Sequence, residues 1–518
     1  MRQLIDDRAR DGQPADPGVE HPDRCVDAGH VISLLSGSGS GRRPHIQSVT
    51  RLDRVTSSLL TDRYELTMID AALRDGRGHE RSVFELFARR LPTGRRYGVV
   101  AGTGRFLELL QEFRFSGDDL AFLKRERVVH DDTLDWLEGY RFSGDVRGYA
   151  EGELYFPGSP ILVVEGGFAE AVVLETLALS VFNYDSAVAS AAARMVQAAE
   201  GRPLSEMGSR RTGERSAIAA ARAAYIAGFA ATSNLEAGRE WGIPTMGTAA
   251  HAFTLLYENE RDAFRAQVAA MGAGTTLLVD TYDIPTGVEN AVAAAGTQLG
   301  AVRIDSGDLG IIVDQVRAQL DRLGATNTRI VVTNDLDEHA IAGLRSAAVD
   351  SYGVGTSLVT GSGAPAAGMV YKLVAHLGDD GGWLQVGKTS EGKATVGGRK
   401  QPVRALHDGA ATGEDIYVED PPIDAAAGRP LLVDLVRGGE ADATRLGHDG
   451  VLRARAHHAA AIAELPVEAL SSPAASPRSP PATSDPRFAP VAPVARASLP
   501  SSTPIGLRER RHAPDRAQ

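Results

Sequence analysis

The sequence contains a single cysteine, Cys25, among 518 residues. One thiol cannot form a disulfide within the chain, and it cannot supply the paired cysteines of a zinc or redox site. A chain without a possible disulfide is typical of a reducing compartment. We therefore expect a cytoplasmic protein.

Long apolar runs and an excess of positive charge are also missing. The apolar run near the start, residues 31–35, is shorter than the roughly 7–15 residues of a signal-peptide core. We expect no stretch that reaches the ~20 apolar residues of a membrane-spanning helix. The net charge of −12 excludes a protein whose affinity comes from neutralising nucleic-acid phosphates. We therefore expect neither a membrane nor a nucleic-acid partner, and any anionic ligand requires locally gathered positive charge.

The two ends of the chain differ in composition from its middle. Residues 1–55 lack hydrophobic periodicity, and residues 466–518 hold eleven of the 26 prolines. Segments of this composition cannot bury a hydrophobic core. We predict a disordered N-terminal extension over 1–55, a disordered proline-rich tail over 466–518, and an ordered body between them.

In the centre of the ordered body, short β-branched segments alternate with segments of helical periodicity. Such alternation indicates parallel strands joined by right-handed helical crossovers. The sequence therefore predicts an irregular β/α barrel over residues 158–376. Its expected strands are 277–281, 301–305, 329–334 and 350–356, with helices at 285–300, 309–324 and 338–348.

Strands of a second kind flank the barrel and predict a smaller α+β domain, built from residues 56–157 and 377–465. Within it, Gly382–Thr389 fits the pattern of a phosphate-binding P-loop. A P-loop requires a helix after its glycines, whereas here the intervening positions read as a strand of a hairpin. We interpret the match as false. The flanking strands are expected at 82–91, 97–101, 145–149, 154–157, 160–165, 370–376 and 383–386.

Polar residues stand at the carboxyl ends of the barrel strands, among them Arg303, Asp305 and Asp335. In β/α barrels and open α/β sheets, ligands bind at that edge. Asp335 and Ser306 could equally cap the following helices. For Arg303 a functional role is the better interpretation. Placing a cation among apolar strand residues costs free energy unless an anion binds to it.

Three short motifs supply further candidate ligand-binding residues for the carboxyl edge of the barrel strands. Thr248 and His251 could share one loop, and Arg210 with Arg211 forms a pair that suits carboxylate or phosphate oxygens. The motif Gly353–Thr356 offers backbone N–H groups where barrels commonly bind phosphate. Each motif alone is weak, but together they favour a phosphorylated, sugar-bearing ligand.

The sequence resembles the nicotinate phosphoribosyltransferase family from about Leu59 to about Arg404. No single motif is decisive, but many of them occur in one order. The matching segments are Leu60–Met68, Phe84–Pro92, Glu206–Arg211, Thr232–Leu235, Gly247–His251, Val302–Asp308, Gly353–Ser357 and Lys388–Ser390, followed by Lys393.

The resemblance implies that the protein transfers a phosphoribosyl group from phosphoribosyl pyrophosphate to nicotinate, a step of NAD salvage. It implies ATP as a co-substrate, consumed through a phosphohistidine at His251, and Mg²⁺ as cofactor. It also implies a homodimer.

The resemblance assigns further residues to substrate binding. Tyr64 would stack on the nicotinate ring, from the same chain or a neighbouring subunit, and Thr248 with Arg303 would hold the carboxylate. The remaining expected contacts are Gly353, Gly355 and Thr356 to the 5′-phosphate, Asp305 to the ribose or the metal, and Arg210 to the pyrophosphate or the carboxylate.

Two alternatives stay open at this point. A nicotinamide phosphoribosyltransferase would bind a neutral substrate and would not need a cation for a carboxylate. An inactive family member could act as a scaffold through its two terminal segments, although Tyr64, His251, Arg303 and Thr356 are all present.

Overall fold

A computed structural model describes residues 57–390, 395–419 and 428–466, together with residue 469 and two short strands at 497–498 and 508–510. The predicted disorder of residues 1–55, and of most of residues 466–518, lies outside the described residues. Lys393 lies outside them as well.

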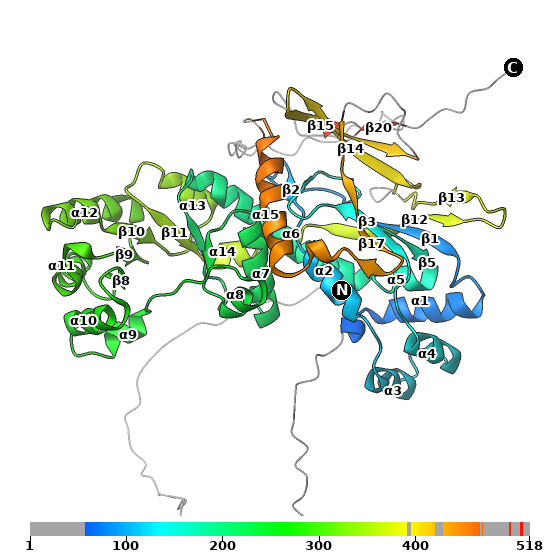
Figure 1. Ribbon diagram of the computed structural model, residues 1–518, viewed down its shortest axis with the longest axis horizontal. Coiled ribbons are helices and arrows are strands. Elements are labelled where there is room, and N and C mark those ends of the chain that lie inside the picture. Colours follow the sequence, from blue (N-terminus) through cyan, green and yellow to red (C-terminus); the bar gives the residue numbers. More distant parts are fainter. Residues whose placement is uncertain are drawn as a thin grey trace, which may run out of the picture. The chain divides into compact units, whose positions relative to one another are not determined.

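Six parallel strands form the sheet that was predicted as an irregular barrel (Figure 1). The order β7-β6-β11-β10-β9-β8 places the four predicted strands side by side and adds two that were not predicted. Neighbouring strands pair in parallel throughout. Their bounds are β6 Leu204–Glu206, β7 Ala231–Thr232, β8 Thr276–Leu278, β9 Ala301–Ile304, β10 Arg329–Val332 and β11 Ser351–Val354.

Helices connect these strands, as the alternation predicted. Helix α13 ends at Gly343 rather than extending to residue 348. Glycine has a low helix propensity, and turn-type hydrogen bonds replace the helical ones after it. The connecting helices are α7 Glu214–Ile226, α8 Leu235–Trp241, α9 His251–Leu255, α10 Glu260–Met271, α11 Ile284–Ala295, α12 Leu309–Arg322 and α13 Glu338–Gly343. Helix α14 (Thr356–Val359) follows β11, the last strand of this sheet in the chain.

A seven-stranded antiparallel sheet combines both ends of the ordered chain, which confirms that the fold has an α+β part. The predicted boundaries differ from it, because β5 (Leu162–Gly167) and β12 (Met369–Leu377) belong to this sheet although they lie within the predicted barrel range 158–376. The strand order of the sheet is β13-β12-β1-β5-β3-β17-β18. The strands are β1 Arg81–Ala88, β3 Asp145–Tyr149, β5 Leu162–Gly167, β12 Met369–Leu377, β13 Trp383–Gln385, β17 Leu432–Arg437 and β18 Glu440–Ala441. Four α-helices of the described residues precede β3 in the chain. They are α1 Arg63–Arg74, α2 Thr103–Glu112, α3 Gly117–Arg125 and α4 Asp131–Glu138.

Two smaller sheets complete the strands. β2 (Gly98–Val99) pairs with β4 (Leu154–Tyr155). β14 (Lys400–His407) and β15 (Ala410–Val418) form a hairpin, flanked by three short strands and followed by a long helix. These are β16 Gly428–Pro430, β19 Ala497–Ser498, β20 Arg508–Arg510 and helix α15 Gly447–Ala463.

The P-loop-like segment is part of a hairpin, as the sequence predicted. β12 and β13 pair antiparallel, with Leu377 opposite Trp383. No helix follows β13 within residues 386–390, so this segment lacks the helix N-terminus that a P-loop uses to bind phosphate.

The expectation that no segment is long and apolar enough to span a membrane was wrong. Phe168–Ala199, which comprises α5 (Phe168–Val172) and α6 (Glu175–Ala199), passes that test by length and composition. In the structure 67 % of its most apolar window is buried inside the protein. Residues of α6 lie in two hydrophobic clusters, one under the parallel sheet and one under the antiparallel sheet. This burial is that of a core helix.

A buried ion pair joins the start of α2 to α7. The Glu151 carboxylate accepts hydrogen bonds from Arg222 Nη2 at 2.8 Å and from the backbone N–H groups of Gly102 and Gly104 at 2.6 and 3.0 Å. Arg222 also lies over the Trp241 ring, 5.4 Å from its centroid. These contacts hold the pKa of Glu151 below its ordinary value despite burial, which alone raises it.

Removing the Arg222 charge should destabilise the protein strongly. We expect Arg222→Met to lower the free energy of unfolding by about 3–5 kcal/mol, because it leaves Glu151 buried without a counter-charge. Because the folded pKa of Glu151 is depressed, the stability from this group is present above its unfolded pKa and declines as the pH falls. Urea denaturation at several pH values measures both effects.

The matched control is Arg437→Met, which breaks the exposed ion pair of Arg437 with Asp434. Surface pairs contribute little, so no measurable change is expected there. An equal loss in both variants would contradict the assigned role of Arg222.

Candidate active site

Asp280 ties two barrel strands together at their carboxyl ends. Its Oδ2 accepts hydrogen bonds from the backbone N–H of Asp305 at 2.8 Å and from Ser306 Oγ at 2.7 Å. Asp280 follows β8, and the two donors follow β9. The predicted site residue Asp305 is therefore held in place by a carboxylate from the neighbouring strand.

Asp305 and His251 face each other across this edge. The Asp305 Oδ2 atom lies 3.9 Å from His251 Nε2, and Asp305 Oδ1 accepts a hydrogen bond from the Thr333 hydroxyl. The other ring nitrogen, Nδ1, lies 3.1 Å from Thr281 Oγ1. With 39 % of its side chain exposed, His251 is both positioned and accessible.

Arg303 is a cation with too few partners. Its Nη1 donates to Thr248 Oγ1 at 3.2 Å, and its Nε is buried without a hydrogen-bond partner among the described residues. Burial lowers the pKa of Arg303, and the nearby positive charge of Arg210 lowers it further, while Asp305 and Asp280 act in the opposite direction. Since a partly buried charge that is compensated only in part is costly, this position favours binding of an anion.

Gly353 allows two parts of the edge to approach closely. A Cβ atom at this position would lie 2.7 Å from both Met207 Sδ and Thr333 Cγ2, which is closer than van der Waals contact permits. Any side chain there would push Thr333 away from Asp305. The glycine is thus required by packing.

Gly355 and Thr356 follow β11 at the same edge. Gly355 precedes α14, and Thr356 is its exposed first residue. The Gly355 carbonyl would lie 3.1 Å from a Cβ atom added at Gly208. The predicted phosphate-binding glycines therefore adjoin the turn that leads to Arg210.

Glu206 is a buried residue to which the sequence analysis gave no role, although it begins one of the segments that match the family. Its carboxylate accepts hydrogen bonds from the Thr232 hydroxyl and the Gly208 N–H, and burial raises its pKa above the ordinary value. These bonds fix the turn that carries the exposed Arg210. Glu206 ends a strand of three residues, which is too short to show a hydrophobic pattern.

Tyr64 is the one predicted site residue that the chain does not bring to this edge. It lies in α1, which Figure 1 shows on the far side of α6 and α7 from β8 and β9. Its side chain is half exposed. Partial burial and the charges of Glu175 and Glu65 raise the pKa of its hydroxyl.

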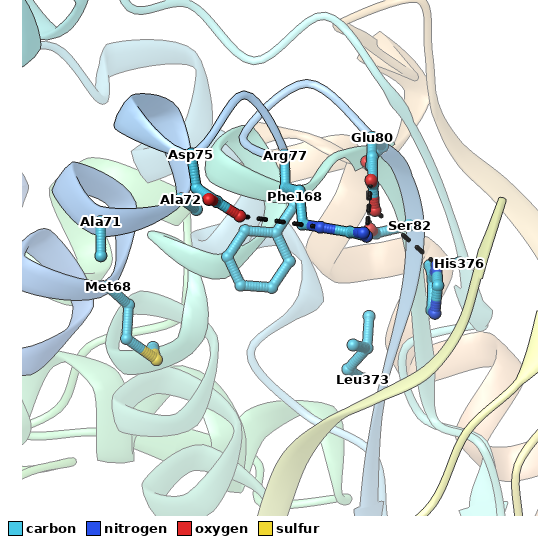
Figure 2. A pocket seen from close by; sticks show the side chains of 10 residues that line it. All are labelled: Met68, Ala71, Ala72, Asp75, Arg77, Glu80, Ser82, Phe168, Leu373 and His376. Atoms are coloured by element: carbon cyan, nitrogen blue, oxygen red, sulfur yellow. Dashed lines mark hydrogen bonds and ion pairs between the residues drawn. The ribbon is translucent and has the colours of Figure 1, made fainter. Parts of the chain in front are cut away.

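A cavity of about 520 Å³ lies near α1, away from the barrel edge (Figure 2). Its apolar floor includes Met68, Phe168 and Leu373, and at its rim Arg77 lies 2.9 Å from Glu80. None of the predicted site residues lines it, so it takes no part in the site described above.

Comparisons with known proteins identify the family of the chain. The family model described as the nicotinate phosphoribosyltransferase (NAPRTase) N-terminal domain matches residues 59–183. The nicotinate phosphoribosyltransferase pncB1 of Mycobacterium tuberculosis is 58% identical over 424 residues, which cover 80% of this chain and 92% of that protein. The chain belongs to the nicotinate phosphoribosyltransferase family.

More distant nicotinate phosphoribosyltransferases agree in sequence and in fold. The enzyme of Bacillus subtilis is 39% identical over 372 residues, covering 70% of this chain and 76% of its own. The crystal structure of human nicotinic acid phosphoribosyltransferase superposes with a TM-score of 0.67 at 25% identity, covering 79% of this chain and 95% of that one. The α/β fold described here is thus that of the family.

Proposed function

We propose that this protein transfers the phosphoribosyl group of phosphoribosyl pyrophosphate to nicotinate, with ATP as co-substrate. The observation that carries the proposal is the under-paired Arg303 cation beside Thr248 at the barrel edge, in a chain of this family. The products are nicotinate mononucleotide and pyrophosphate.

In this reaction, Arg303 and Thr248 hold the nicotinate carboxylate. Nicotinate is an anion at neutral pH, and its ring nitrogen has a lone pair that needs no general base. That nitrogen forms a bond to C1 of the ribose while the bond from C1 to the pyrophosphate oxygen breaks. Holding both reactants in line supplies much of the rate acceleration, and cationic groups such as Arg210 stabilise the departing charge.

The phosphoribosyl group lies along the same edge. Thr356 and the backbone N–H groups of Gly353 and Gly355 contact the 5′-phosphate, and Asp305 faces the ribose hydroxyls. Mg²⁺ fits beside them, because Asp280 Oδ1 is buried without a hydrogen-bond partner and this ion needs only one or two carboxylates besides water and phosphate. Asp280 and Asp305 would hold it, and the ion would neutralise pyrophosphate charge.

His251 couples the transfer to ATP. One imidazole nitrogen attacks the γ-phosphorus of ATP, ADP departs, and the phosphohistidine is later hydrolysed to phosphate. In the tautomer whose Nδ1–H donates to Thr281 Oγ1, the lone pair that attacks is on Nε2. Asp305, 3.9 Å away, keeps the ring oriented toward the bound substrates.

Tyr64 completes the site from a second copy of the chain. Within one chain α1 lies on the far side of α6 and α7 from the barrel edge (Figure 1), so its tyrosine cannot stack on a ring held by Arg303. A two-fold dimer would place each Tyr64 against the partner's site.

Arg303→Ala should weaken nicotinate binding by more than ~1.5 kcal/mol, the scale of a hydrogen bond to a charged group. Calorimetric titration with nicotinate measures this change. The unaltered enzyme should prefer nicotinate to nicotinamide by at least about tenfold in kcat/KM, or ~1.4 kcal/mol, and the variant should lose that preference. Arg329→Ala, an exposed arginine at the opposite end of the neighbouring strand, is the control. An unchanged nicotinate affinity, or equal turnover of acid and amide before mutation, would reject the contact.

His251→Ala should abolish ATP hydrolysis that depends on nicotinate, as well as transfer of labelled γ-phosphate from ATP to the protein. The circular dichroism spectrum should stay unchanged, because His251 is half exposed. The exposed His407 provides the control, and His407→Ala should label normally. Persistent labelling of the His251 variant at another residue would contradict the assignment.

Mixing Tyr64→Ala chains with Arg303→Ala chains should restore activity that neither variant has alone. In a random mixture of two-fold dimers, about a quarter of all sites combine intact Tyr64 with intact Arg303. The measurement is nicotinate mononucleotide formation after dissociation and reassembly of the mixture. No recovery, with mixed dimers verified by mass spectrometry, would rule out a shared site.

A further inference from the structure

We propose that a second cavity, between α6, α13 and two turns of the chain, binds a small phosphorylated molecule. The cavity has a volume of about 450 Å³, within the range of roughly 300–1,000 Å³ that is usual for small-molecule sites. The turn after β1 contributes Arg95, α6 contributes Arg194, α13 contributes Glu338 and His339, and the turn after α14 contributes Ser362 and Gly363.

Positive charge exceeds negative charge among these residues. Glu338 is the carboxylate of the cavity, and both of its oxygens are already engaged. Oε1 lies 3.0 Å from Arg194 Nη2, and Oε2 accepts a hydrogen bond from Ser362 Oγ at 2.7 Å. Glu338 therefore forms an ion pair with Arg194, one of the two arginines that line the cavity.

Arg95 is the second guanidinium group, and Glu338 forms its ion pair with Arg194 instead. Among the described residues Arg95 forms no ion pair, and its Nη2 donates to the carbonyl of Gly361. Burial lowers its pKa below the ordinary value and the Arg194 charge lowers it further, while the charge of Glu338 acts in the opposite direction without reversing the shift. Two partly buried guanidinium groups that repel each other across a cavity are stabilised when an anion binds between them.

The chemistry of the walls favours a phosphate group. Guanidinium groups present planar sets of N–H donors that match phosphate oxygens bidentately. Gly94 and Gly363 add open backbone, since a Cβ atom at either would meet nothing within 4 Å. The volume leaves room for an organic part beyond the phosphate, so the expected class is a sugar phosphate or a similar monoester.

This cavity is separate from the proposed active site. None of the residues Thr248, His251, Arg303 or Asp305 lines it, and the proposal does not rest on phosphoribosyl transfer. The turn at Gly361–Gly363 follows α14 directly, so the cavity adjoins the helix that begins with Thr356 but shares no residue with it.

Titration calorimetry with inorganic phosphate, at constant ionic strength, tests the site in the full chain. Arg95→Met and Arg194→Met should each raise the phosphate Kd of one binding event by at least about tenfold. Glu338→Gln should lower the same Kd by at least about threefold, because it removes the competing negative charge. A variant that simply unfolds weakens binding, so the tightening in Glu338→Gln distinguishes the site from general damage.

Thr356→Val is the matched control at the active site. It should leave this binding event unchanged while it weakens any phosphate bound at the barrel edge. Binding that responds to Thr356→Val but not to the Arg95, Arg194 and Glu338 variants would overturn the proposal. So would the absence of any binding event that the Arg95 variant alters.

A second titration with ribose 5-phosphate identifies the form of the ligand. Tighter binding than inorganic phosphate, lost in Arg95→Met, indicates a phosphorylated organic molecule. Equal affinity would overturn the part of the proposal that assigns the remaining volume to an organic group. Phosphoribosyl transfer is measured separately, so either proposal can fail without the other.

Discussion

The candidate site depends on one unbalanced charge, the Arg303 guanidinium at the carboxyl edge of the parallel sheet. Apolar strand neighbours withdraw it from water, and the carboxylates of Asp280 and Asp305 compensate only part of the cost. The Oδ2 atom of Asp280 already accepts a hydrogen bond from the backbone N–H of Asp305 in the loop after β9. The protein thus holds a cation that a bound carboxylate would stabilise, and this explains how a neutral pyridine could be discriminated against.

The protein treats its buried arginines in two ways. Arg222 is paired through Nη1 and Nη2 with the Glu151 carboxylate, whose oxygens also accept hydrogen bonds from two backbone N–H groups, so its charge is balanced and its role is structural. Arg303 and Arg95 are partly buried, and each donates to a neutral oxygen, Thr248 Oγ1 and the Gly361 carbonyl respectively. Arg95 also lines the second cavity. The contrast separates arginines that stabilise the fold from arginines that bind ligands.

Periodicity and residue type predicted much of this structure. The strands that carry Arg303 and Gly353 were placed from their β-branched residues, and the false P-loop was rejected from its hairpin context. Strands β6 and β7 have only two or three residues, so their sequences show no period, and the structural role of Glu206 at the end of β6 was not predicted. Helix α6 was missed as an apolar segment because Asn183 and Asp185 interrupt its alanines. The position of Tyr64 relative to the barrel depends on tertiary packing, which no local pattern encodes.

Helix α6 contributes side chains to both large hydrophobic clusters. Leu177 and Phe182 near its start pack in the cluster under the antiparallel sheet, whereas Val188 and Met195 further along pack in the cluster under the parallel sheet. If either cluster loses its packing, the part of α6 that belongs to that cluster becomes exposed to solvent. Thermal melting of the two halves should therefore be cooperative, and a ligand that tightens one half will slow hydrogen exchange in the other.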